Sequence, residues 1–106
     1  MRSFVRVGAL DDLWSGEMRG YVVLGIKVVL VRMDDAVFAY EDRCAHLGVM
    51  LSKGSLEGRV LTCHAHHWQY DVCTGGGVNP VSARLKRFPV KLERGDVFVD
   101  VGEVGP

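Results

Sequence analysis

The sequence predicts a small all-β domain, built as an antiparallel sandwich or barrel. Three observations point to this fold class. Helical periodicity is almost absent, short runs rich in Val, Ile, Leu and aromatic residues recur along the chain, and turn signals separate them about every 8–12 residues. Thirteen glycines against three prolines indicate tight turns and irregular loops. With 106 residues there is room for one domain, which we expect to cover residues 1–106.

The strands follow from the apolar runs and from the turn signals between them. Two hairpins are expected, one around Asp34-Asp35 and one around Arg94-Gly95-Asp96, where apolar residues alternate on both sides. The expected strands are residues 4–7, 21–24, 26–32, 36–40, 59–62, 68–72, 90–92 and 97–101. Together they account for most of the apolar residues and favour a β structure over a helical one.

Residues 10–18 are the one helical candidate, because Asp11 and Asp12 are typical of a helix start and glycines follow. A single short turn is expected there. Within it, Trp14 and Met18 stand four residues apart, so we expect them to pack together onto the sheet instead of binding a partner.

Composition excludes several function classes. Thirteen basic and thirteen acidic residues give a net charge of zero and a pI near 6.9, which argues against nucleic-acid binding and against a polybasic membrane-surface protein. The first residues lack the apolar segment of a secretory signal, and the longest apolar run is shorter than the roughly 20 residues that span a bilayer. We therefore expect a cytoplasmic protein, in which thiols stay reduced and cysteines are more often metal ligands.

Two short segments carry the residues suited to metal chemistry. The first holds Cys44 and His46, the second Cys63 and His66, and each follows a predicted strand. Mixed sulfur and nitrogen ligands suit zinc or an iron–sulfur cluster. Zinc sites usually bring their cysteines in close pairs, whereas here each cysteine is paired with a histidine. One Cys and one His on each of two loops matches a binuclear centre in which two Cys bind one iron and two His the other.

With these residues the sequence resembles the Rieske [2Fe–2S] ferredoxins, whose signature is C-x-H followed by C-x-x-H. The resemblance covers almost the whole chain. Residues 11–18 and 77–80 are similar to the ferredoxin components of toluene monooxygenase systems. Further matches after the second motif are Trp68, Tyr70, Asp71, Thr74 and Gly75. The resemblance implies a Rieske fold with a cluster-binding subdomain made by two loops, at about residues 42–80. It also implies a Rieske-type [2Fe–2S] cluster whose ligands are Cys44, His46, Cys63 and His66, with no catalytic residue.

The chain departs from many Rieske proteins at five positions. Ala45 and His64 stand where many have proline, and His67 stands where many have glycine. The toluene monooxygenase ferredoxins also lack that glycine. Val49 and Ala65 occupy the positions of the disulfide cysteines of respiratory Rieske proteins. Without that disulfide, we expect a reduction potential near the low end of the Rieske range of about −150 to +300 mV.

Side chains near the predicted ligands have simpler interpretations. His64 and His67 are expected to be exposed loop residues. Cys73 fits no ligand position, and we expect a small, partly buried thiol. Trp68 either shields the cluster from water or fills the core, and the sequence does not favour one of these. For Tyr70, packing is favoured over a hydrogen bond to a ligand sulfur.

Glycines near the two loops have an expected role in the site. Gly48, Gly75, Gly76 and Gly77 would let the backbone approach the cluster closely. Pro80 is expected to close a third loop over it, as in the related proteins. These positions therefore belong to the predicted site without being ligands.

The resemblance implies an electron carrier. It would take single electrons from an NADH-dependent flavoprotein reductase and pass them to the diiron hydroxylase of an aromatic, toluene-type monooxygenase. Four protein ligands leave no open coordination site, so we expect no enzymatic activity, and we expect a monomer that binds neither nucleic acid nor membrane. The alternatives are a ferredoxin of a ring-hydroxylating dioxygenase, a small Rieske subunit of a nitrite reductase, and a zinc-binding interaction module.

Overall fold

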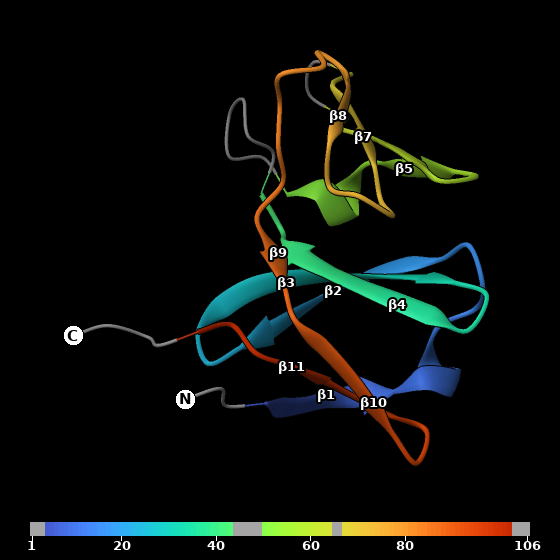
Figure 1. Ribbon diagram of the computed structural model, residues 1–106, viewed down its shortest axis with the longest axis vertical. Helices are drawn as coiled ribbons and strands as arrows, with labels where there is room; N and C mark the ends of the chain where they lie inside the picture. Colours follow the sequence, from blue (N-terminus) through green and yellow to red (C-terminus); the bar gives the residue numbers. More distant parts are fainter. Residues whose placement is uncertain (1–3, 44–49, 65–66, 103–106) are drawn as a thin grey trace.

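The computed structural model describes residues 4–43, 50–64 and 67–102, which form three stacked antiparallel sheets (Figure 1). We call them the lower sheet (order β1-β11-β10), the middle sheet (β2-β3-β4-β9) and the upper sheet (β5-β6-β7-β8). The strands are β1 Val5–Ala9, β2 Met18–Val23, β3 Ile26–Met33, β4 Ala36–Glu41, β5 Ser55–Glu57, β6 Val60–Thr62, β7 Gln69–Asp71, β8 Gly77–Asn79, β9 Arg87–Phe88, β10 Val90–Glu93 and β11 Asp96–Val99. The predicted all-β class is confirmed. The helices of the described residues are all too short to cross a membrane.

Strand β3 explains why the chain has one long apolar run. Val28 and Leu30 point into the lower core, between the middle and lower sheets, while Val29 and Val31 point into the upper core, below the upper sheet. All four side chains are at most 1% exposed. A strand that is buried on both faces needs continuous apolar sequence, not alternation. This strand therefore joins the two cores into one body.

The two expected hairpins are present. Strands β3 and β4 pair around the turn at Asp34, which has a φ of 57°, and β10 and β11 pair around Arg94 and Gly95 with φ of 52° and 80°. Positive φ values match the turns that suit tight hairpins. Strands β5, β8 and β9 were not expected from the sequence, because each holds a single large apolar residue beside polar residues or glycine, whereas the equally short β6 and β7 lie in apolar runs.

The prediction of a helical turn over residues 10–18 is correct only for its start. A 3-10 helix, η1, covers Leu10–Asp12 and then ends. The Nη1 group of Arg32 donates to the carbonyl oxygens of Leu10 (3.1 Å) and Leu13 (2.8 Å). The guanidinium thus satisfies carbonyl groups that a continuing helix would have used, and it fixes the segment against β3.

The expected packing of Trp14 with Met18 is wrong for Trp14. The Trp14 side chain is 79% exposed, and its backbone N–H donates to Glu17 Oε1 at 3.4 Å. Met18 begins β2 and packs against the upper core. Because the helix ends before Trp14, the two side chains do not share a helical face.

Candidate metal centre

Cys63 lies at the start of a closed loop between β6 and β7. The Cys63 side chain is buried, with 1% exposure. Its backbone N–H donates to the Trp68 carbonyl at 2.8 Å, and its carbonyl accepts from the His67 N–H at 3.0 Å. His67 has a φ of 59°, a conformation that turns the chain back sharply. The backbone therefore holds a thiol inside the protein while His64 and His67 are exposed, as expected.

Of the four predicted ligands, the structure places only Cys63. Cys44, His46 and His66 lie outside the described residues, as does Gly48. Within the described ranges, no group of three His, Cys, Asp or Glu side chains is positioned to hold a metal ion. The complete ligand set therefore stays a prediction, and the described residues show what supports it.

The neighbours of Cys63 contribute to the upper core. Trp68 is partly buried and packs against this core, and Tyr70 is fully buried within it. Cys73 is partly buried against the same core, and its backbone N–H donates to Asp71 Oδ1 at 2.9 Å. The position of Cys73 agrees with the small, partly buried thiol expected there, and the packing role of Tyr70 stays a prediction.

Tyr40 connects the middle sheet to the loop that follows β7. Its hydroxyl donates to the Val72 carbonyl at 2.6 Å, and burial raises the pKa of Tyr40 to about 12. A Cβ at Gly75, where φ is 79°, would lie 3.0 Å from Tyr40 Cε1. The sequence predicts Tyr40 only as part of a strand. A single tyrosine in an apolar run carries no signal for a contact 32 residues away.

The remaining glycines also face protein atoms of the upper region. A Cβ at Gly77 would collide with the Pro80 carbonyl oxygen and lie 2.9 Å from that of Ala83, and one at Gly76 would lie 3.3 Å from Arg84 Nη1. The Gly77 N–H donates to the Ala83 carbonyl at 2.8 Å. Contacts with this loop require small residues at Gly76 and Gly77 and tighten the loop that contains Pro80, while the expected approach of these glycines to a cluster stays a prediction.

The Asp71 carboxylate fastens two turns of the upper sheet together. Arg59 Nε, in the turn before β6, donates to Asp71 Oδ2 at 3.0 Å, while the Cys73 N–H donates to Oδ1. Partial burial opposes ionisation of Asp71. The hydrogen bonds from Arg59, Cys73 and Thr74 and the charge of Arg59 outweigh it and lower the pKa of this carboxyl.

Asp42 and Ser52 join the two ends of the segment that carries Cys44 and His46. Asp42 follows β4 and is 4% exposed, and Ser52 belongs to the 3-10 helix η2, Leu51–Lys53. Ser52 donates to both carboxylate oxygens, from N at 2.8 Å and from Oγ at 2.6 Å. This pair holds η2 against the middle sheet. Charge-assisted bonds of this length are among the strong hydrogen bonds in proteins.

The one predicted ligand among the described residues, Cys63, fits an iron–sulfur group. It is a buried thiol in a backbone-closed loop, and cysteine thiolates are the ligands that hold iron–sulfur clusters. Around Cys63, the upper core and the hydrogen bonds Tyr40–Val72, Asp42–Ser52 and Arg59–Asp71 fix the neighbouring segments. A rigid surround of this kind is what fixes metal ligands in place.

Comparison with known proteins decides the family. The chain matches the Rieske [2Fe-2S] domain over residues 3–89. It belongs to this family. It is 43% identical over 97 residues to the ferredoxin component of the alkene monooxygenase system of Xanthobacter autotrophicus, covering 91% of this chain and 80% of that protein. It is 33% identical over 99 residues to the ferredoxin component of the naphthalene 1,2-dioxygenase system of Pseudomonas putida, covering 92% and 95%.

Solved structures confirm the Rieske fold. A chain in the complex of reduced oxygenase and oxidized ferredoxin in carbazole 1,9a-dioxygenase superposes with a TM-score of 0.85 at 31% identity, with 94% of each chain covered. The ferredoxin of carbazole 1,9a-dioxygenase from Nocardioides aromaticivorans gives 0.85 at 28% identity, covering 92% of this chain and 97% of that one. The family match and the ferredoxin relatives confirm the Rieske-type [2Fe–2S] cofactor and the role as an electron-transfer component.

Proposed function

We propose that this Rieske ferredoxin carries single electrons from an NADH-dependent flavoprotein reductase to the diiron hydroxylase of an aromatic, toluene-type monooxygenase. The observation that carries the monooxygenase assignment is the 43% identity to an alkene monooxygenase ferredoxin component, against 33% to that of naphthalene 1,2-dioxygenase from Pseudomonas putida. The aromatic substrate class rests on residues 11–18 and 77–80, which are similar to toluene monooxygenase ferredoxins.

The proposed ligands are Cys44 and Cys63 on one iron and His46 and His66 on the other. The burial of Cys63 and its closed backbone loop support this set. When bound, the cluster accepts and returns one electron, and two neutral imidazoles in place of two thiolates make the added charge easier to accept. The protein supplies the buried thiol and the loop that presents the second histidine.

Further features complete the proposal. Residues 1–106 form one domain, of which about 42–80 bind the cluster, and the protein works as a cytoplasmic monomer. Its four ligands saturate both irons, so substrates have no site on the metal. Electron transfer therefore requires two docking events, one with the electron-donating reductase and one with the electron-accepting oxygenase.

A second candidate is the ferredoxin of a ring-hydroxylating dioxygenase. The observation in its favour is the superposition on the carbazole dioxygenase ferredoxin at a TM-score of 0.85. The carrier chemistry of the two candidates is the same, so only the partner separates them. An experiment must therefore compare acceptors directly.

Stopped-flow oxidation of the reduced protein by two acceptors makes that comparison. One acceptor is a diiron aromatic hydroxylase, and the other is a Rieske-type terminal dioxygenase. We expect fast, saturable transfer to the hydroxylase alone. Transfer to the dioxygenase alone would overturn the monooxygenase assignment and leave the ligand assignment standing.

A further inference from the structure

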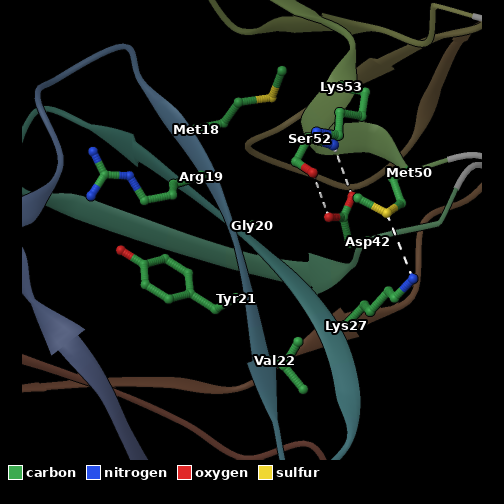
Figure 2. A pocket seen from close by; sticks show the side chains of 10 residues that line it. All are labelled: Met18, Arg19, Gly20, Tyr21, Val22, Lys27, Asp42, Met50, Ser52 and Lys53. Atoms are coloured by element: carbon green, nitrogen blue, oxygen red, sulfur yellow. Dashed lines mark hydrogen bonds between the residues drawn. The ribbon is translucent and has the colours of Figure 1, made fainter.

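A groove lies on the middle sheet beside η2, outside the metal centre. It has a volume of about 510 Å³ and adjoins a second groove of about 420 Å³. The two share Lys27, Asp42 and Met50. Figure 2 shows Lys27, Met50 and Lys53 on one side of β2, near Gly20. We call this pair of hollows the β2–η2 groove.

The β2–η2 groove is positively charged. Lys27, Lys53 and Arg43 line it and are exposed. Among the described residues, no carboxylate oxygen lies within 4.0 Å of a charged nitrogen of these three side chains. The ion pairs of the described part of the chain involve other basic residues. Asp42 also lines the groove and keeps its negative charge, because Ser52, which donates to both of its oxygens, is neutral. Lys27 Nζ donates to Met50 Sδ at 3.7 Å, which leaves the lysine charge uncompensated. Three cations therefore face a partner, although the chain as a whole has no net charge.

Two more residues limit or complete this charge pattern. Glu41 lines the second hollow and contributes one opposing carboxylate. Arg19 lines the first, but it extends from the other side of β2 (Figure 2) and its Nη2 lies 3.7 Å from Glu17 Oε1. The balance of the groove therefore stays positive, and it rests on Lys27, Lys53 and Arg43.

The floor of the groove is open and partly apolar. A Cβ at Gly20 would lie 3.0 Å from both Ser52 Oγ and Asp42 Oδ2, so glycine leaves room where any other residue would crowd the wall. Met18, Met50 and the 69% exposed Val22 supply apolar surface. Flexible methionine side chains suit surfaces that adapt to a partner. Cations around apolar contacts match an acidic protein segment better than a small anion.

The groove is continuous with the proposed site through the chain. Arg43 and Met50, the described residues on either side of the segment 44–49, both line it. That segment holds the proposed ligands Cys44 and His46. A partner seated in the groove thus contacts both ends of a ligand-bearing loop, which favours an electron-transfer partner over an unrelated one.

We propose that the β2–η2 groove docks an acidic segment on the surface of the terminal oxygenase component. This inference rests on the proposed function, which makes an oxygenase the electron acceptor. Carboxylates of that segment pair with Lys27, Lys53 and Arg43, and an apolar residue contacts the methionines. Such complementary charge speeds association and fixes the docked orientation.

The double variant K27E/K53E tests the groove. The matched control K91E/R94E changes the net charge equally on the β10–β11 hairpin, at the opposite end of Figure 1 from η2. Binding to whichever oxygenase the unmodified protein reduces is measured by titration calorimetry at low and at physiological salt. We expect K27E/K53E to raise the Kd about fivefold or more at low salt and to remove most of its salt dependence. The control should stay within about twofold.

Two further readouts keep the test specific. The reduction potential of K27E/K53E should equal that of the unmodified protein, and a shifted potential would overturn a docking role. An unchanged Kd would overturn the proposal. If the Kd is unchanged and reduction of the variant by the reductase is slower, the groove docks the reductase instead of the oxygenase. Since the oxygenase is chosen by the stopped-flow comparison, failure of the monooxygenase assignment is recognised separately.

Discussion

The upper sheet and the two sheets below it are stabilised in different ways. Strand β3 has eight residues and contributes side chains to both cores, whereas each strand of the upper sheet has three. The upper sheet packs on the upper core through Leu61 and Tyr70. It is held further by single polar links, from Tyr40 to Val72 and from Arg59 to Asp71, and by glycines packed against neighbouring groups. The metal-centre end is thus positioned by individual contacts, and single substitutions should affect it more than the layers below.

The largest effect is expected for Cys63→Ser, which removes the one predicted ligand among the described residues. The protein should lose the bulk of its iron and acid-labile sulfide, because serine is a poor substitute for a thiolate on iron. The lower and middle sheets should stay folded, so most of the far-ultraviolet circular dichroism of the protein should be retained. Iron analysis and EPR of the reduced protein check this. Cys73→Ser is the control and should retain the cluster; full iron content in Cys63→Ser would remove Cys63 from the ligand set.

Gly77→Ala should be the most destabilising of the packing changes. The new Cβ would meet the carbonyl oxygens of Pro80 and Ala83, and we expect a loss of about 3 kcal/mol. Gly25→Ala, in the β2–β3 turn at φ 81° with no atom within 4 Å, should cost only about 1 kcal/mol for the backbone conformation. Urea denaturation compares them. Equal losses would mean that the upper region adapts as easily as the hairpin.

Tyr40→Phe should lower stability by about 1–2 kcal/mol by removing the hydrogen bond to Val72. Tyr21→Phe is the control, because the Tyr21 hydroxyl makes no hydrogen bond to the described residues. The pKa of Tyr40 is raised from 10.0 to about 12, so its stabilising contribution is complete below pH 10.0 and is lost as the pH rises towards about 12. Denaturation at alkaline pH should show this decline in the unmodified protein and not in Tyr40→Phe.

Asp71→Asn should have the smallest effect and should depend on pH in the opposite direction. The pKa of Asp71 is lowered from 3.8, so its contribution is present above that value and is lost as the pH falls through the folded-state pKa. The unmodified protein should be slightly more stable than Asp71→Asn at pH 7, and the difference should vanish in acid. Asp35→Asn, on a fully exposed carboxylate, should show no such change. A difference for Asp71→Asn that persists in acid would assign the effect to shape, not charge.

The sequence predicts the middle and lower sheets better than the upper sheet. Apolar runs long enough to show a pattern, such as β3, were placed correctly, because burial dictates their composition. Strands β5 and β8 each hold one large apolar residue beside polar residues or glycine, so they show no such run. The sequence predicts that the helical turn continues after Asp12. It cannot show that Arg32, on β3, donates hydrogen bonds to the carbonyl oxygens of Leu10 and Leu13.

The candidate site divides in a similar way. Ligand spacing predicts Cys63 together with Cys44, His46 and His66, because metal geometry demands particular residue types, and this set stays a prediction. The supporting contacts of Tyr40 and of Asp42 with Ser52 were missed. They join residues distant in the chain, and tyrosine, aspartate and serine are common enough that their presence signals nothing.

The burial of β3 on both faces has a consequence for how the molecule opens. Amide hydrogens of β3 exchange with solvent only when both cores come apart, so their exchange reports the unfolding of the whole chain. Amides of β5 and β8, in short strands of one sheet, are released by a smaller, sub-global opening. We therefore expect faster amide exchange in β5 and β8 than in β3.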